Sequence, residues 1–164
     1  YGEHREFLEF NLDQHRELKA FCEEICITYS TSVWDTHSAK EIASIDPVFI
    51  KIPSACNNNF EMLDWLCENY SGDIHISTGM TTKNEIETIV NFFEKKGRSK
   101  DLVVYNCTSG YPVPFEDVCL LDIIKLKDKY ENIDFNIYFA YPIRLFKKDG
   151  TKFYFCRATP FIIA

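Results

Sequence analysis

The sequence predicts an α/β fold in which strands and helices alternate around a parallel sheet. Apolar runs typical of buried strands begin near residues 27, 48, 73 and 101, and a stretch with helical apolar spacing follows each run. A turn rich in Ser, Thr or Gly also follows each strand. Strict alternation implies right-handed crossovers between parallel strands, so the sheet is either doubly wound or part of a (β/α) barrel.

The first elements are expected before residue 53. Apolar residues recur at helical spacing over residues 13–26, which predicts an amphipathic helix with Asp13 as its cap. A strand is expected at 27–31, followed by a loop and a short helix at 37–45. The apolar run over 48–52 then predicts a strand that is buried on both faces.

The pattern continues to about residue 130. Thr82 and Glu85 form a capping box that begins a helix, and Gly97 ends it. The other elements expected here are a helix from about residue 59, strands at 73–77 and 101–107, and a helix over about 116–130.

The pattern changes after residue 131. Apolar and polar residues alternate from Ile133 to Phe139, which is typical of a half-exposed antiparallel strand. Residues 147–150 form a turn signal, and residues 152–157 are expected to return as a second strand. The tail over 132–164 is therefore predicted to be a β-hairpin.

Composition favours one globular domain and narrows the range of partners. The chain has 164 residues, 46% of them hydrophobic, and a net charge of −7. The negative charge and the scattered Lys and Arg residues argue against a nucleic-acid partner. The sequence has no run of the roughly 20 apolar residues that a membrane helix needs, and no signal peptide, so we expect a cytoplasmic protein without a membrane partner. Because the first residue is Tyr, we expect a portion of a longer product.

Lys51 interrupts the apolar strand at 48–52, and a turn of small residues that begins at Ser54 follows it. A lysine in this position must reach solvent along its stem or meet an anion. Because parallel strands bring their C-terminal ends to one rim, Lys51 and the Ser and Thr turns would converge there. The sequence therefore indicates either an oxyanion site or a lysine that extends to solvent. The turns concerned are 30–32, 54, 77–79 and 108–110.

Three segments, FIKIPSACNNNFEML, IHISTGMTTKNEI and VVYNCTSGYPVP, give the chain a family resemblance. Their order and spacing resemble those of the N-acetylneuraminate (sialic acid) synthases and of their legionaminate and pseudaminate relatives. The resemblance covers about residues 2–130 and implies a partial (β/α)8 TIM barrel of about four to five β/α units over residues 1–131. The chain looks like a truncated member with an aberrant C-terminal β-hairpin over 132–164. Its unpaired sheet edges would favour a homo-oligomer.

The resemblance implies a transferase that condenses phosphoenolpyruvate with N-acetylmannosamine or a related N-acylated amino sugar, with phosphate release. A divalent metal, Mn²⁺ or Mg²⁺, would assist. The residues that the resemblance assigns to phosphoenolpyruvate are Lys51, Ser54, Ser77 and Thr31, and those assigned to the sugar and the enolpyruvate are Ser109 and Tyr111.

The chain departs from the family in its metal ligands. The family holds its metal with two histidines on strands after residue 130, but the segment NIDFNIYFAYPIR contains none, and none follows. The four histidines, of which His75 is the last, lie upstream, and His75 is expected to be a core residue. We therefore assign no metal ligands. The alternatives are a catalytically inert truncated homologue and an aldolase that forms a Schiff base at Lys51.

Overall fold

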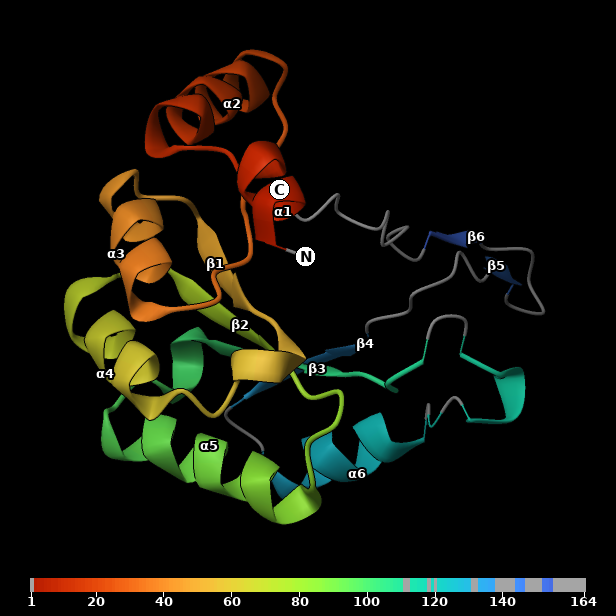
Figure 1. The fold of residues 1–164 in the computed structure, drawn as a ribbon. Coiled ribbons are helices and arrows are strands. Elements are labelled where there is room, and N and C mark those ends of the chain that lie inside the picture. Colours follow the sequence, from red (N-terminus) through yellow and green to blue (C-terminus); the bar gives the residue numbers. More distant parts are fainter. Residues whose placement is uncertain are drawn as a thin grey trace.

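The computed structural model describes residues 2–110, 113–117, 119, 121–130, 133–137, 144–146 and 152–154. Within these residues, four strands form one parallel sheet in the order β1-β2-β3-β4 (Figure 1). The strands are β1 Phe49–Ile52, β2 Asp73–Ser77, β3 Leu102–Asn106 and β4 Asp134–Ile137. The α-helices are α1 Gly2–Leu8, α2 Leu12–Glu24, α3 Thr36–Ser44, α4 Phe60–Asn69, α5 Lys83–Lys95 and α6 Asp122–Lys129. Short 3₁₀ turns are η1 Ser54–Cys56, η2 Ser99–Asp101 and η3 Phe115–Asp117.

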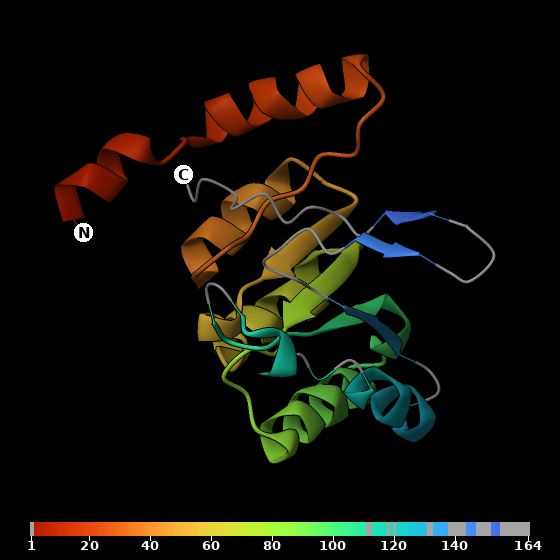
Figure 2. The ribbon, with the colours of Figure 1, turned by 90° about the vertical axis from the view of Figure 1, so that its right-hand side faces the viewer.

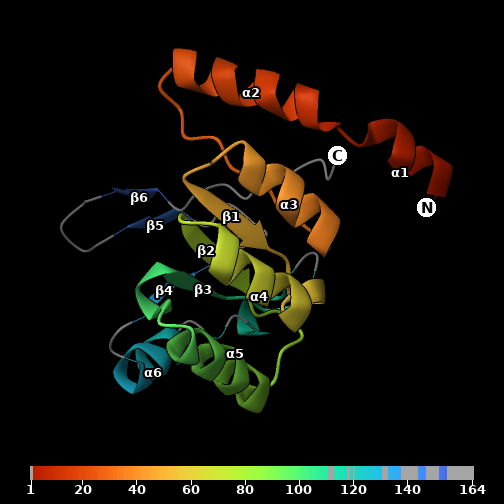
Figure 3. The ribbon, with the colours of Figure 1, turned by 90° about the vertical axis from the view of Figure 1, so that its left-hand side faces the viewer.

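The α/β alternation predicted from the sequence is confirmed from α3 to β4. Figure 3 shows α3, α4 and α5 in front of β1, β2 and β3, so these helices cover one face of the sheet. The capping box of Thr82 and Glu85 is present at the start of α5, where each residue bonds the main-chain N–H of the other. Gly97 follows α5 with a φ of +69°, in the left-handed region that suits glycine.

The first helix differs from its prediction in its cap and its packing. Asn11, and not Asp13, caps α2: its side chain accepts a hydrogen bond from Gln14 N at 3.0 Å. The helix is amphipathic as expected, but none of its residues is buried, and Phe21 is 56% exposed. Figure 2 shows α1 and α2 extending away from the sheet.

The segment 27–31 does not form the expected strand. Its end meets β1 through a hydrogen bond from Ser30 Oγ to Phe49 O at 2.7 Å and, just beyond it, through an isolated parallel bridge between Ser32 and Lys51. Two main-chain hydrogen bonds hold this bridge, from Lys51 N to Thr31 O at 3.1 Å and from Val33 N to Lys51 O at 3.0 Å. Ile27 is 56% exposed. β-Branched residues raise strand propensity, but a segment that buries so little apolar surface gains little by pairing over its whole length.

The strand expected to be antiparallel after residue 132 is parallel. β4 pairs with β3 in parallel register, with Val104 opposite Phe135. An alternating pattern reports only that one face of a strand is more buried than the other, and a strand at the end of a parallel sheet meets that condition equally well. The helix expected over 116–130 is shorter, because η3 and α6 are separate elements.

The tail contains a second pairing. β5 Arg144–Phe146 pairs antiparallel with β6 Lys152–Tyr154. The turn signal at 147–150 and the end of the expected strand at 155–157 lie outside the described residues. The described residues of the two strands expected to form the hairpin do not pair with each other, because β4 pairs with β3 and β6 pairs with β5. The domain boundary at residue 131 stays a prediction.

The hydrophobic core lies between the sheet and its helices. Alternate residues of β1, β2 and β3 point into it, and apolar side chains of α4 and α5 cover them. Among the described residues, no helix combines the length and the hydropathy needed to cross a membrane. The core residues with no exposed surface include Ile50, Ile52, Leu63, Leu66, Ile74, Ile76, Phe93 and Leu102.

Arg98 ties the end of α4 to the start of β2. Its guanidinium donates to Cys67 O at 2.9 Å, to Tyr70 O at 2.7 Å and to Gly72 O at 3.1 Å, and forms an ion pair with Asp101. Carbonyls left behind at a helix end need such donors, because water reaches them poorly. Arg98 therefore fixes where β2 begins.

We expect Arg98→Ala to lower the free energy of unfolding by about 2–4 kcal/mol, because it leaves three carbonyls and a carboxylate without their donor. Urea denaturation followed by circular dichroism would measure the change. Lys100→Ala, at an exposed position nearby, should change stability by no more than about 0.5 kcal/mol. Equal effects of the two substitutions would contradict the role given to Arg98.

Candidate anion-binding site

One face of the sheet carries apolar core residues and the other carries polar side chains. The ladder pairs Lys51 with His75, and Ser77 with Tyr105. Residues paired in a parallel ladder share a face, and side chains alternate between the faces along each strand. Lys51, His75 and Ser77 therefore lie on the face that α3, α4 and α5 leave uncovered, and none of them belongs to the helix-side core.

Lys51 is half-buried on this open face. Burial lowers the pKa of its ammonium, and the nearby Cys107 acts weakly in the opposite direction. The main chain of Lys51 is fixed by the two hydrogen bonds that join it to Thr31 and Val33. Because partial burial weakens the screening of charge, an anion beside this ammonium would be attracted more strongly than at an exposed lysine.

Ser77 ends β2 with a buried hydroxyl. Its side chain is only 3% exposed, and its Oγ has no hydrogen-bond partner among the described residues. The amide of Asn57, which follows η1, donates to Ser77 O at 2.9 Å and to Thr81 Oγ1 at 2.6 Å. Thr78 Oγ1 donates to Tyr105 O at 2.8 Å. The turn after β2 is thus fixed from both neighbouring strands, and Ser77 Oγ remains available to a ligand.

Gly79 allows two other hydroxyls to approach the same turn. A Cβ at this position would lie 2.8 Å from Ser109 Oγ and 2.9 Å from Ser54 Oγ. Real side chains essentially never approach so closely, so only glycine leaves these hydroxyls in place. The exits of β1, β2 and β3 therefore meet here, as the parallel arrangement predicts.

The donors of this rim converge near the thiol of Cys107, just after β3. Burial raises the pKa of this thiol. The Ser77 hydroxyl, the N–H groups of Thr78 and Gly79 and the Lys51 ammonium all act in the other direction, because each favours negative charge at the sulfur. Ser77 Oγ acts on the sulfur in this way although it meets no partner at full hydrogen-bond geometry among the described residues. These groups all favour negative charge near the sulfur, although the Thr78 N–H already donates to Tyr105 O at 3.1 Å.

Four of the residues assigned from the sequence are brought together: Lys51, Ser54, Ser77 and Ser109. Thr31 contributes its carbonyl to the main chain of Lys51, but the bridge places the Ser32 side chain, rather than that of Thr31, on the Lys51 face. Tyr111 lies outside the described residues. The binding roles of all six residues stay proposals.

His75 is not the core residue that was expected. It is half-buried on the open face, where its ring stacks on Phe49 with centroids 4.0 Å apart and Nδ1 lies 2.8 Å from Tyr105 Oη. Burial lowers its pKa, Lys51 lowers it further and Asp73 raises it. The available signal was its spacing of two residues from Ser77, which places both side chains on one face.

Within the described ranges, no three His, Cys, Asp or Glu residues lie close enough together to hold a metal ion. The described residues do not fit a metal centre, and we derive no step through a metal.

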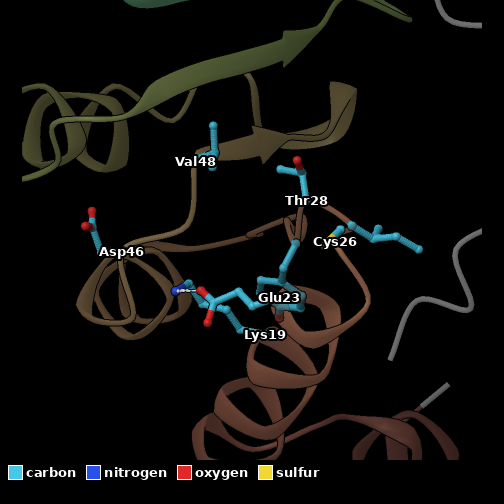
Figure 4. A pocket seen from close by; sticks show the side chains of 8 residues that line it. Lys19, Glu23, Cys26, Thr28, Asp46 and Val48 are labelled. Atoms are coloured by element: carbon cyan, nitrogen blue, oxygen red, sulfur yellow. Dashed lines mark hydrogen bonds and ion pairs between the residues drawn. The ribbon is translucent and has the colours of Figure 1, made fainter.

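A separate cleft lies between the end of α2 and the start of β1 (Figure 4). It contains the ion pair of Lys19 and Glu23, at 2.6 Å, and none of the residues of the rim.

Comparison with known proteins gives concordant results. A model of the NeuB family matches residues 1–135. The chain is 35% identical over 133 residues to the N-acetylneuraminate-9-phosphate synthase of Drosophila melanogaster. The aligned region covers 81% of this chain and 35% of that protein. The chain thus spans about a third of the length of this curated relative.

Two solved structures are similar in fold. A spore coat polysaccharide biosynthesis protein E from Chromobacterium violaceum superposes with a TM-score of 0.78 at 21% identity, over 88% of this chain and 42% of the other. An N-acetylneuraminic acid (sialic acid) synthetase from Leptospira borgpetersenii, in complex with citrate, gives a TM-score of 0.72 at 26% identity, over 85% of this chain and 49% of the other. The α/β fold of this chain therefore matches part of larger proteins.

The surroundings of Cys107 predict its reactivity. Because burial raises its pKa, little thiolate is present near neutral pH, and iodoacetamide at about pH 8 should alkylate Cys107 at least about tenfold more slowly than the exposed Cys26 and Cys119. Timed alkylation with peptide mass spectrometry would measure each rate, and in urea the three rates should become similar. Equal rates for Cys107 and Cys26 in the folded chain would show that the thiol is not held in the rim.

Proposed function

This chain belongs to the NeuB family, and we propose that it carries the phosphoenolpyruvate-binding part of an enzyme of sialic (nonulosonic) acid biosynthesis. The proposed reaction condenses phosphoenolpyruvate with N-acetylmannosamine or a related N-acylated amino sugar and releases phosphate. We propose that the sheet is part of a (β/α)8 barrel. The observation that carries the proposal is that Lys51 and the buried Ser77 hydroxyl, which has no partner among the described residues, lie on one face of the sheet, while Ser54 and Ser109 meet at Gly79 in the turn after Ser77.

The chemistry of phosphoenolpyruvate suits this rim. The molecule carries a phosphate and a carboxylate, so it needs a fixed positive charge and donors that are already oriented. Lys51 would supply the charge, and the turn held by Asn57 would supply the N–H of Gly79, which need not reorganise when the ligand arrives. Ser77 Oγ, which is buried without a partner among the described residues, would gain one in the bound ligand.

The remaining hydroxyls extend the rim towards the second substrate. Ser54 and Ser109 meet at Gly79, beside the proposed phosphoenolpyruvate position. We propose that Ser109, with Tyr111, contacts the sugar and the enolpyruvate, and that Thr31 assists at the phosphate. The family resemblance implies Mn²⁺ or Mg²⁺, but the described residues of this chain do not provide its ligands.

Two other functions make different predictions. An inert homologue would bind phosphoenolpyruvate without turnover, and the absence of histidine from the segment NIDFNIYFAYPIR favours this alternative. Incubation with phosphoenolpyruvate, N-acetylmannosamine and Mn²⁺, with phosphate release as the readout, separates the two. An aldolase would instead form a covalent adduct at Lys51 with a keto substrate, which borohydride would trap.

We expect Lys51→Ala to weaken phosphoenolpyruvate binding at least about tenfold, because the ligand loses its fixed counter-charge in a half-buried site. Isothermal titration calorimetry of the whole chain would measure the affinity. Lys100→Ala removes a lysine from an exposed position and serves as the matched control, with an expected change below about twofold. Unchanged affinity in Lys51→Ala would return Lys51 to the alternative of a lysine that reaches solvent.

Gly79→Ala tests the close approach of the three strand exits. The added methyl group must displace Ser54 and Ser109, so we expect phosphoenolpyruvate affinity to fall at least about fivefold while the fold is retained. Gly2→Ala, where nothing lies within 4 Å of an added Cβ, is the control. Calorimetry and circular dichroism on both variants would separate lost binding from lost structure, and normal affinity in Gly79→Ala would remove Ser54 and Ser109 from the site.

A further inference from the structure

His75 borders the same space as the proposed anion. It lies directly opposite Lys51 in the β1–β2 ladder, and neighbouring strands are about 4.8 Å apart. Ser77 follows two residues later on the same face, about 6.6 Å along the strand. The imidazole is therefore on the same face of the sheet as the ammonium and the buried hydroxyl of the rim, one strand from Lys51 and two residues from Ser77.

The ring of His75 is held in place while one nitrogen remains available. Phe49 stacks on the ring with an interplanar angle of 14°, and Tyr105 Oη lies 2.8 Å from Nδ1. Nε2 has no hydrogen-bond partner within the described part of the chain. A fixed ring with one such nitrogen can donate a hydrogen bond to a ligand without losing much conformational freedom.

We propose that His75 is the second cationic group of this anion site and takes up a proton from solvent when a phosphate, sulfate or carboxylate group binds beside Lys51. This inference rests on the proposed function, because it uses the same rim. The proton adds to the imidazole, and no bond of the ligand is made or broken.

The charges around His75 support this coupling. Burial and the Lys51 ammonium both lower its pKa, and Asp73, on the same strand, acts against them. Tyr105 on β3 is the hydrogen-bond partner of Nδ1, and the half-buried thiol of Cys107, just after β3, is neutral because its pKa is raised. In the ligand-free chain the imidazole is therefore mainly neutral near pH 7. A bound dianion would offset the repulsion from Lys51 and attract the imidazolium, so it would raise the pKa of His75.

The sign of the pH dependence follows from this linkage. If the pKa of His75 is higher in the bound state, affinity is constant above the higher pKa, rises as the pH falls between the two pKa values, and becomes constant again below the lower one. Anion binding should therefore strengthen in mildly acidic solution. A site that relied on Lys51 alone would show no such change in this range, because its ammonium remains charged throughout.

Inorganic sulfate is the appropriate probe, because it stays dianionic at every pH used. We expect the affinity of the whole chain for sulfate to rise at least about fivefold from about pH 8 to about pH 5.5, as a histidine near its titration range requires. Sulfate should also raise the pKa of His75 in an NMR titration of the imidazole protons, while the exposed His37 should not respond. His75→Gln should lose the increase at low pH, so its affinity for sulfate should stay nearly constant from about pH 8 to about pH 5.5.

Tyr105→Phe is a second variant in case His75→Gln does not fold. It keeps the aromatic ring but removes the acceptor for Nδ1–H of the imidazolium, so the rise in affinity should move to lower pH. Sulfate binding with a pH-independent affinity and an unmoved His75 pKa would overturn this inference and leave the anion site intact. If neither sulfate nor phosphoenolpyruvate binds, or if Lys51→Ala leaves the affinity for both unchanged, the proposed function is overturned, and this inference with it.

Discussion

The in-register pairing of β1 with β2 and of β2 with β3 is the constraint on which the site depends. The same ladder that puts Ile50, Ile52, Ile74 and Ile76 against the helices puts Lys51 and His75 on the opposite face. A shift of one residue would exchange the faces of a strand. It would bury an ammonium in the helix-side core and expose isoleucines, so the cost of a misplaced charge and the gain from apolar burial select the same register.

The loops after the strands are held by polar groups that the core cannot supply. Asn57 is 4% exposed, and its amide satisfies two acceptors in the turn after β2. Thr78 joins that turn to β3. A buried side-chain amide without partners would be costly, so these bonds are retained whether or not a ligand is present. The rim is consequently ordered before binding, which lowers the entropy that a ligand must overcome.

The sequence predicted the repeated α/β units well, because apolar spacing and capping residues are local signals. The start and end of β2 and the capping box at Thr82 are examples. The failures have non-local causes. Whether residues 27–31 pair fully, and whether β4 runs parallel, depends on what lies beside each segment, which the spacing of its own residues does not report.

The same distinction applies to the rim. Lys51 and the Ser and Thr turns could be found from the sequence, because parallel strands end at one edge. The sequence does not show as directly on which face of the sheet each side chain lies. The choice between Thr31 and Ser32 depends on the register of an isolated bridge, and the exposure of His75 depends on which face the helices leave uncovered. Arg98 has a local partner in Asp101, but the carbonyls that it bonds lie far from it in sequence, so no local pattern reveals them.

Burial acts on the three titratable groups of the rim in a consistent way. It lowers the pKa values of Lys51 and His75 and raises that of Cys107, so in each case it favours the neutral form. A lysine starts from a much higher pKa than a histidine, so Lys51 stays charged while His75 and Cys107 become neutral. The open face therefore keeps the positive charge of Lys51, while burial favours the neutral forms of His75 and Cys107. An anion that enters meets one ammonium, several oriented N–H and O–H dipoles, and an imidazole whose charge depends on whether the anion is present.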